Sequence, residues 1–302
     1  MAMSSEAEAI NDDTCCASCG VAEGDDIKLK KCTACHLVRY CGVKCQREHR
    51  PQHKRACKKR AAELRDEILF KQLESSHMGD CPICCLPLSL DAEKSTMMAC
   101  CSNMICKGCG YTNGIREIRE SLDQRCPFCR HRMPKTHDEA VKDFMKRVEA
   151  NDPAAQREFG NRRLSEGDHV SALECWTKAV DLGDVVAHFE LHCFYRDGKG
   201  VEKDMKKVIY HAEQAAIGGH HLARFNLGGI EWENGKVERA VKHWIIAANL
   251  GDDEALGTLR WCYDVGFVSK ENFSATLRAH KAALDATKSP QREAAEVFHA
   301  SC

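Results

Sequence analysis

Cysteine and histidine residues at metal-ligand spacing dominate the first half of the sequence. Seventeen of the 21 cysteines lie between Cys15 and Cys129, in two compact blocks. Many stand in Cys-x-x-Cys pairs, whose turn can direct two thiolates toward one tetrahedral zinc ion about 2.3 Å away. In a secreted chain this density would indicate disulfides, whereas in a reducing compartment pairs mixed with histidine indicate metal. We therefore expect zinc at closed four-ligand sites, which leave no position for a catalytic water.

The first block supplies eight candidate zinc ligands. Two Cys-x-x-Cys pairs come first, and two pairs with members one helical turn apart follow, so each later pair shares a helix face. The eight residues are Cys16, Cys19, Cys32, Cys35, Cys41, Cys45, His53 and Cys57. Eight ligands make two tetrahedral sites. Cys15 is interpreted as a spare thiol, and His36 and His49 as surface or supporting residues.

The first block resembles the MYND zinc finger. The resemblance is carried by Tyr40-Cys41, Cys45-Gln46, His49, His53-Lys54 and Cys57. It implies interleaved sites, with Cys16, Cys19, Cys41 and Cys45 on one ion and Cys32, Cys35, His53 and Cys57 on the other. It also implies binding of short proline-containing peptides. The tryptophan that usually follows the position of His49 is replaced here by Arg50 and Pro51, so one usual residue of the peptide groove is absent.

A basic run accompanies the first block. Between Lys28 and Arg60 there are twelve Lys and Arg residues and a single acid, Glu48. One interpretation is a nucleic-acid patch or a nuclear signal. The interpretation that we favour is charge balance, because seven thiolates and two divalent zinc ions sum to a net charge of −3. Only one aromatic residue, Tyr40, lies within the run, so nucleic-acid binding is not expected.

The second block, residues 81 to 129, supplies eight further thiolates. It opens with Cys81-Pro-Ile-Cys84 and closes with Cys126-Pro-Phe-Cys129-Arg130. Between these pairs stand Cys100, Cys101, Cys106 and Cys109. The block resembles a RING finger of the all-cysteine variety. That resemblance implies one ion on Cys81, Cys84, Cys106 and Cys109, and another on Cys126, Cys129 and Cys100 or Cys101. Cys100 and Cys101 could both serve, His131 is an outside candidate, and Cys85 has no assigned role.

The resemblance to RING fingers carries an expectation about partners. RING-type ubiquitin ligases recruit a ubiquitin-conjugating enzyme through a shallow apolar surface and position its thioester for attack by a substrate lysine. Ile83, Pro127 and Arg130 match that surface and the arginine that bridges the conjugating enzyme and ubiquitin. No catalytic residue is implied within the finger. The alternative is a zinc-stabilised scaffold without such recruitment.

Internal repeats mark the C-terminal half. Alanines recur at positions 155, 187, 223 and 255, and the units close on Gly183, Gly219 and Gly251. Small residues at a fixed phase let two helices pack closely, and glycine ends the second helix in a left-handed conformation. The second unit resembles the Sel1 repeat, a relative of the tetratricopeptide repeat, through Tyr195, Gly198, Gly200-Val201, Asp204 and Gly219-His220. Such arrays stack into a superhelix, and the resemblance implies an adaptor for proteins.

These features predict small zinc-stabilised modules, a MYND finger and a RING-like cross-brace, followed by an all-α Sel1-like solenoid. The predicted boundaries are a disordered tail at 1–13, the first finger at 14–58, a linker helix at 59–77, the second finger at 78–133, a linker helix at 134–149, repeats at 150–288 and a C-terminal tail at 289–302. The chain has 44 basic and 45 acidic residues, no signal-peptide pattern and no apolar run of about 20 residues. We expect an intracellular protein, cytoplasmic or nuclear, without membrane association.

The combined hypothesis is a RING-type ubiquitin ligase or ligase adaptor with about four structural Zn²⁺ ions. A ubiquitin-conjugating enzyme would bind the second finger, and the repeats would select protein substrates. Short peptides are candidate ligands of the first finger. The alternative is a non-catalytic, zinc-stabilised scaffold for protein–protein interaction. A methyltransferase is excluded as a hypothesis because residues 150 to 300 are repeats with no methyl-donor motif.

Overall fold

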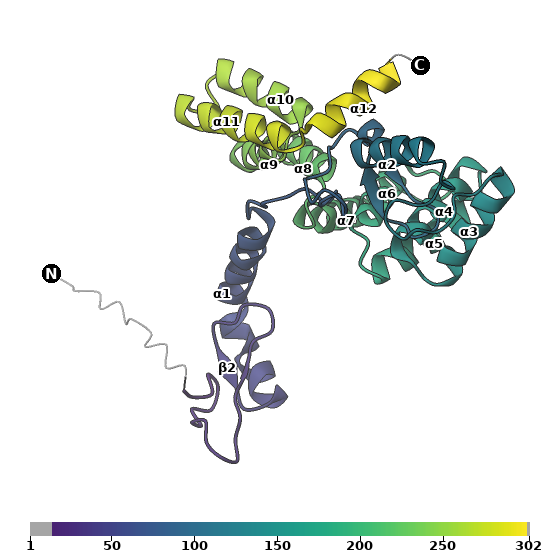
Figure 1. Ribbon diagram of the computed structural model, residues 1–302. Helices are drawn as coiled ribbons and strands as arrows, with labels where there is room; N and C mark the ends of the chain where they lie inside the picture. Colours follow the sequence, from purple (N-terminus) through teal and green to yellow (C-terminus); the bar gives the residue numbers. More distant parts are fainter. Residues whose placement is uncertain (1–13, 301–302) are drawn as a thin grey trace. The chain divides into compact units, whose positions relative to one another are not determined.

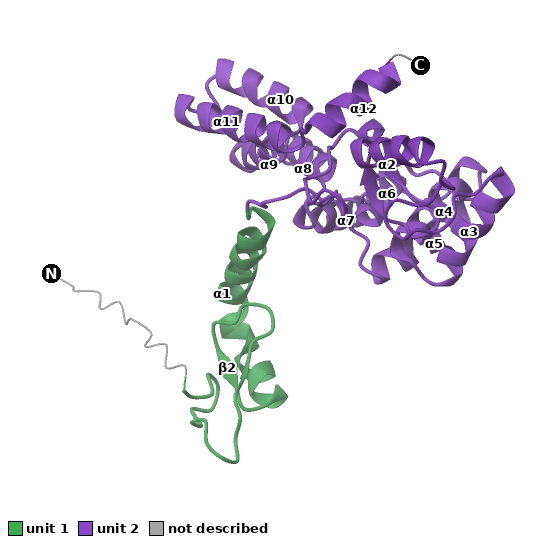
Figure 2. Cartoon of the chain, viewed as in Figure 1, with its two compact units in different colours: residues 1–71 green, residues 72–302 purple. Residues whose placement is uncertain are grey.

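The computed structural model describes residues 14–300, and the chain divides into two compact units, residues 1–71 and 72–302 (Figures 1 and 2). The tail predicted at 1–13 and the last two residues of the predicted C-terminal tail lie outside the described part. Among residues 14–300, no helix combines the length and the apolar character needed to cross a membrane.

The first unit is a short hairpin followed by one long helix. β1 (Lys30–Lys31) and β2 (Arg39–Tyr40) pair antiparallel, with Lys30 opposite Tyr40. α1 (Val43–Leu69) then runs for 27 residues and covers the first part of the linker predicted at 59–77. The core of this unit consists largely of cysteine: Cys16, Leu29, Cys32, Cys35 and Tyr40. A core of this size supplies little hydrophobic stabilisation, so the unit needs metal to fold.

The second unit begins with a compact region, residues 78–133, which we call the second zinc module. It contains the one-turn helix η1 (Ala92–Lys94), the antiparallel strands β3 (Ser95–Met97) and β4 (Met104–Cys106), and α2 (Lys107–Arg119). β4 leads directly into α2, so Cys106 also caps the helix, and its thiol accepts a hydrogen bond from the backbone N–H of Cys109. Strand and helix together fix the direction of this pair of thiols.

The rest of the second unit is helical. α3 (His137–Glu149) covers most of the linker predicted at 134–149. Four hairpins follow: α4 (Pro153–Ser165) with α5 (His169–Asp181), α6 (Val185–Asp197) with α7 (Met205–Ile217), α8 (His221–Glu233) with α9 (Val237–Asn249), and α10 (Asp253–Asp264) with α11 (Lys270–Ala286). The helices of each hairpin pack on each other, and each hairpin contacts the next (Figure 1). A last helix, α12 (Pro290–Ala300), lies in the stretch predicted as a tail and packs on α2.

Repeated caps set the phase of the hairpins. The four repeat alanines are fully buried, and the backbone N–H of each donates to a side chain three residues earlier. The capping residues are Asp152, Asp184, His220 and Asp252. Such a cap satisfies one of the free N–H groups of the first helical turn. Cap and alanine together therefore start the first helix of every hairpin at the same point of the repeat.

Glycine permits the close contact within two of the hairpins. A Cβ atom at Gly228 would lie 2.2 Å from Trp244 Nε1, and one at Gly160 would lie 2.7 Å from Trp176 Nε1. The indole rings of α5 and α9 thus pack directly on the backbone of α4 and α8. The predicted glycine stop of the second helix is found at Gly251, where φ is 99°.

Candidate metal centres

The structure brings the sixteen predicted zinc ligands together as four groups of four. The groups are Cys16, Cys19, Cys41 and Cys45; Cys32, Cys35, His53 and Cys57; Cys81, Cys84, Cys106 and Cys109; and Cys100, Cys101, Cys126 and Cys129. Within each group the ligand atoms lie within 4.8 Å of one another. The first two groups are interleaved along the chain, as are the last two, so each module is cross-braced by its two sites.

The separations within the groups fit a shared zinc ion. Four ligands about 2.3 Å from one ion at tetrahedral angles lie about 3.8 Å apart. The Sγ–Sγ distances are 3.6 Å for Cys19–Cys41, 3.8 Å for Cys32–Cys57, 3.8 Å for Cys84–Cys106 and 3.9 Å for Cys101–Cys126. A disulfide needs about 2.05 Å, and no disulfide joins the cysteines of the described part. Three all-sulfur sets and one set of three sulfurs and one nitrogen match structural zinc.

In the first module, α1 contributes to both sites. Cys45 belongs to the first turn of α1 and meets the turn of Cys16 and Cys19, whereas His53 and Cys57 lie further along the helix. His53 Nε2 is 3.2 Å from Cys35 Sγ in the second group. Because each ion joins the N-terminal loops to α1, the two ions together hold the helix against the hairpin.

Backbone donors lower the pKa of the first cysteine in both Cys-x-x-Cys turns of the first module. Burial raises the pKa of the Cys16 thiol, but the backbone N–H groups of Cys19 and Cys41 lower it more, and its pKa falls to about 6. The pKa of Cys32 falls to about 6 for the same reason, with burial opposed by the N–H groups of Ala34 and Cys35. Since the thiolate is the metal-binding form, the lowered pKa raises the fraction of thiolate that is ready to bind zinc.

His49 supports a zinc ligand and belongs to neither group in the first module. Its Nδ1 lies 3.1 Å from the hydroxyl oxygen of Tyr40, and its ring stacks on His53 with centroids 5.6 Å apart. Tyr40 is buried in the cysteine core. The contact chain from Tyr40 through His49 to His53 orients the imidazole ligand, as supporting residues do in metal sites. His36 likewise lies outside both groups.

The second module uses adjacent cysteines in one site. Cys100 Sγ is 3.4 Å from Cys129 Sγ, and Cys101 Sγ is 3.9 Å from Cys126 Sγ. A tight turn makes this possible, since the backbone N–H groups of Cys101 and Ser102 both donate to Met98 O and Ser102 has a φ of 55°. His131 stands outside the group, with Nε2 2.9 Å from Asp143 on α3. Cys85 is exposed and also stands outside.

The three residues predicted to contact a conjugating enzyme all reach the surface of the second zinc module. Ile83 is 40% exposed, and Arg130 is exposed with its guanidinium 3.4 Å from Asn113 Oδ1. Pro127 is half-buried and lines a pocket of about 430 Å³ beside α2, together with Tyr111 and Phe298.

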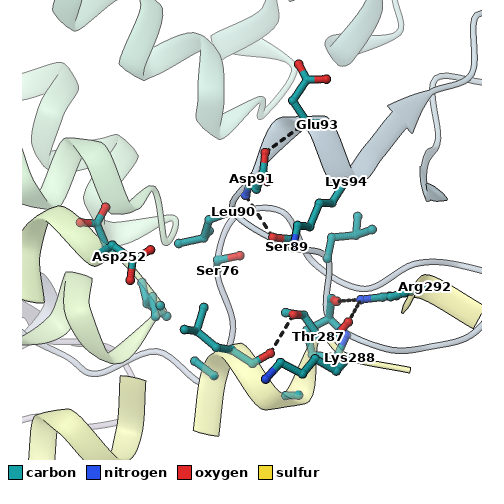
Figure 3. A pocket seen from close by; sticks show the side chains of 18 of the residues that line it. Ser76, Ser89, Leu90, Asp91, Glu93, Lys94, Asp252, Thr287, Lys288 and Arg292 are labelled. Atoms are coloured by element: carbon teal, nitrogen blue, oxygen red, sulfur yellow. Dashed lines mark hydrogen bonds between the residues drawn. The ribbon is translucent and has the colours of Figure 1, made fainter. Parts of the chain in front are cut away.

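A larger cleft lies within the second unit and is drawn in Figure 3. Its volume is about 1080 Å³, and its walls come from the second zinc module, from the α8–α10 region and from α12 with the end of α11. Apolar side chains contribute to the lining: Leu88, Leu90, Leu222, Leu250 and Leu284. The acids of the lining are Glu74, Asp91, Glu93, Asp252, Asp253, Glu254, Glu293 and Glu296, against Lys94, Lys107, Lys288 and Arg292. The eight acids outnumber the four basic residues, so the cleft is net acidic. Lys94 is paired with Glu296 at 3.0 Å.

Two sets of residues were missed by sequence reasoning. The capping residues carried a usable signal, because an aspartate stands three residues before three of the four repeat alanines. Arg292 carried none: it lies 31 residues beyond Trp261, the nearest tryptophan of the repeats, in a stretch without ligands, yet its side chain reaches the second zinc module. Only the folded arrangement shows this contact.

Comparison with known proteins identifies the first module and finds two solved structures that resemble part of the chain. The family model of the MYND finger matches residues 16–57. No curated protein matches the chain. A Sel1 repeat protein from Oxalobacter formigenes is 26% identical over 40% of this chain and 96% of its own, with a TM-score of 0.36. A protective antigen with an SLR fold from uropathogenic Escherichia coli is 23% identical over 61% of this chain and 38% of its own, with a TM-score of 0.38.

These observations settle the architecture. Residues 16–57 match the MYND finger in sequence and supply two complete ligand groups. The second zinc module supplies two more, and helical hairpins at the repeat spacing follow it. The chain thus consists of N-terminal cysteine-rich zinc-binding modules, the first of them a MYND finger, followed by an all-helical Sel1-like repeat region.

Proposed function

We propose that the protein is a zinc-stabilised scaffold that binds other proteins and has no catalytic step of its own. The observation that carries this proposal is the completeness of the four ligand groups, each with four cysteine or histidine donors. Zinc with four protein ligands builds structure, whereas catalytic zinc keeps a position for water or substrate. The MYND finger and the repeat region are both module types that present surfaces to partners.

The cleft of the second unit is the partner site that this proposal favours. Its leucines offer an apolar lining, and its carboxylates outnumber its basic side chains. Electrostatic complementarity selects partners of opposite charge, while buried apolar contact supplies affinity. The favoured occupant is a peptide segment that places an apolar residue between lysines or arginines.

Binding of two synthetic peptides to the full chain tests this site. The first peptide carries leucine flanked by lysines, and the second has glutamate in place of every lysine. We expect the basic peptide to bind, to weaken as salt is raised, and to lose about tenfold in affinity with Glu254→Lys, a change equivalent to about 1.4 kcal/mol. Glu174→Lys, on exposed α5 surface outside the cleft, is the control. Equal binding of both peptides, or equal loss in both variants, would contradict the proposal.

A second candidate function is RING-type ubiquitin ligation. It is supported by the exposure of Ile83 and Arg130 on the second zinc module and by the place of Pro127 beside an apolar pocket. Recruitment of a conjugating enzyme that carries ubiquitin as a thioester needs such an apolar surface. Arg130 would hold the ubiquitin so that the thioester is positioned for attack.

Autoubiquitination in a purified system separates the two candidates. The assay compares wild type, Arg130→Ala and the control Arg132→Ala, an exposed arginine two residues away, against a panel of conjugating enzymes. Ubiquitin chains that weaken with Arg130→Ala and persist with Arg132→Ala would establish a ligase and refute the non-catalytic scaffold. Absence of chains with every conjugating enzyme, from protein shown to hold zinc, would leave the scaffold as the function.

A further inference from the structure

The C-terminal helix contacts a zinc ligand of the second zinc module. The Arg292 guanidinium donates through Nη2 to Cys84 Sγ at 3.4 Å and to Leu86 O at 3.1 Å. Through Nη1 it donates to Pro87 O at 2.6 Å and to Thr287 O at 2.7 Å. One side chain of α12 therefore binds the Cys84 sulfur, two carbonyl groups of the loop that follows Cys84, and the end of the repeat region.

Close packing holds this arginine in place. A Cβ atom at Gly108, on α2, would lie 2.8 Å from the backbone nitrogen of Arg292, so the two helices meet backbone to backbone. Tyr111 and Phe298 pack with ring centroids 5.1 Å apart, and Lys94 pairs with Glu296 at 3.0 Å. Arg292 is only 9% exposed in this setting. A charged side chain buried to this degree needs compensating partners.

The metal centre supplies negative charge that compensates the buried charge of Arg292. Four thiolates on one Zn²⁺ carry a formal charge of −2, and the group of Cys81, Cys84, Cys106 and Cys109 is such a set. A hydrogen bond from a guanidinium to a thiolate sulfur is charge-assisted and favours the ligating form of the sulfur. The two carbonyl contacts fix the loop after Cys84, which orients that ligand in the way that supporting residues do.

We infer that Arg292 is a positioning residue of the zinc site formed by Cys81, Cys84, Cys106 and Cys109, so that the C-terminal helix is part of this metal centre. Among the described residues, Arg292 makes no hydrogen bond to the other site of the same module, which is formed by Cys100, Cys101, Cys126 and Cys129. The effect of Arg292 is therefore specific to one of four sites. Through it, zinc binding in the module is linked to docking of the helix that ends the repeat region.

Cadmium substitution resolves the four sites individually and tests this role. In ¹¹³Cd NMR spectra of the full chain, Cys84→Ser identifies the resonance of the site concerned. We expect Arg292→Gln to shift or broaden that resonance alone, and we expect zinc at that site to exchange about 10- to 100-fold faster, the usual effect of losing a supporting residue. Arg292→Lys keeps the charge but loses the forked geometry, and it should give a smaller effect on the same resonance.

Three results would overturn the inference. They are wild-type spectra and exchange rates in Arg292→Gln, equal disturbance of both sites in the second zinc module, and general unfolding of the second unit in both Arg292 variants. The last two would assign Arg292 to overall folding of the region. Glu296→Gln is the matched control, since it breaks the ion pair of α12 with Lys94 and leaves the contact with Cys84 intact; it should leave the resonance in place.

Discussion

At the scale of single residues, the position of each sulfur atom decides which side chains share an ion. Cys100 and Cys101 are adjacent in sequence, and adjacent side chains usually diverge. Here the turn after Met98 directs Cys100 toward Cys129 and Cys101 toward Cys126. Cys85, by contrast, is exposed and belongs to none of the four ligand groups, although it follows the ligand Cys84 directly. Backbone geometry therefore decides which cysteines are ligands, since the residue type is the same in each case.

We predict that Cys101→Ser lowers the zinc content by one ion per chain, because the remaining three thiolates no longer close the site. Cys85→Ser, which removes a thiol outside the four groups, should keep the wild-type content. Native mass spectrometry of both variants provides the measurement. Full zinc content in Cys101→Ser would show that another residue, such as His131, completes the site.

The spacing of the cysteines was enough to predict the ligands, because a Cys-x-x-Cys turn and a one-turn helical pair have few ways to close around an ion. Their division into groups came from the resemblance to the MYND and RING fingers. The spacing could not decide whether Cys101 or His131 is the fourth ligand of the site with Cys100, Cys126 and Cys129. That choice depends on the φ of Ser102 and on the contact of His131 with Asp143. Nor could it find Arg292, whose partner Cys84 is more than 200 residues away along the chain. The spacing of neighbouring residues predicts local geometry, but it does not predict contacts between distant segments.

Two stacked histidines, the half-buried His77 and the buried His220, make the second unit sensitive to acid. The His77 ring stacks on the His220 ring at 4.2 Å, and the His77 backbone N–H donates to Gly219 O at 3.2 Å. Burial, reinforced by the charge of His221, lowers the pKa of His77 from 6.5 to about 4. Burial, reinforced by His77, lowers the pKa of His220 to about 2.

We predict that the second unit loses stability as pH falls from about 6.5 toward 4. In this window the unfolded chain binds protons that the folded chain excludes, so the free energy of unfolding falls with pH by up to about 1.4 kcal/mol per pH unit for each histidine. His77→Gln should reduce the slope. Urea unfolding followed by tryptophan fluorescence is suitable, because all four tryptophans lie in the repeat region. The control is His137→Gln, an exposed histidine of α3, and equal slopes in wild type and His77→Gln would contradict this account.

At the scale of elements, the repeat hairpins depend on small residues at two neighbouring positions with different roles. Gly228 faces the indole of Trp244, whereas a Cβ atom at Gly229 would meet nothing within 4 Å. Both glycines lie inside α8. The close contact with Trp244 therefore requires glycine at position 228, whereas position 229 has space for a larger side chain.

We predict opposite effects of two alanine substitutions in α8. Gly228→Ala should destabilise the repeat region by about 1–3 kcal/mol, because the new methyl group overlaps the Trp244 ring. Gly229→Ala should stabilise it by about 0.5–1 kcal/mol through better helix propensity. Urea midpoints from circular dichroism measure both changes. Similar midpoints for the two variants would mean that the close contact of α8 and α9 is not as described.

The sequence predicted the elements unevenly. Alanine and glycine recurrence located the hairpins, since the same side chains that permit close helix packing also mark the phase of the repeat. Docking of α12 on α2 was not foreseen, because the contact is made by Gly108 and Arg292 from distant segments and has no periodic signal. The 27-residue α1 was foreseen only as separate pieces, since a helix that contains metal ligands has an interrupted apolar pattern.

At the scale of the whole molecule, metal replaces hydrophobic burial as the source of order in the zinc-binding modules. The cores of both modules consist mainly of cysteines that also bind metal, whereas the repeat region has an aliphatic and aromatic core. Removal of zinc should therefore unfold the first module and the second zinc module first. The repeat helices, whose buried alanines and tryptophans make their own contacts, should keep their structure.

The zinc content of the purified full chain tests this account most directly. Native mass spectrometry should show four zinc ions per chain, and a strong chelator should remove them with loss of amide protection in the first half of α1 and in α2 while α4 to α9 remain protected. A content near two, or loss of protection in every helix at once, would contradict the account of two double zinc sites on an independently folded repeat region.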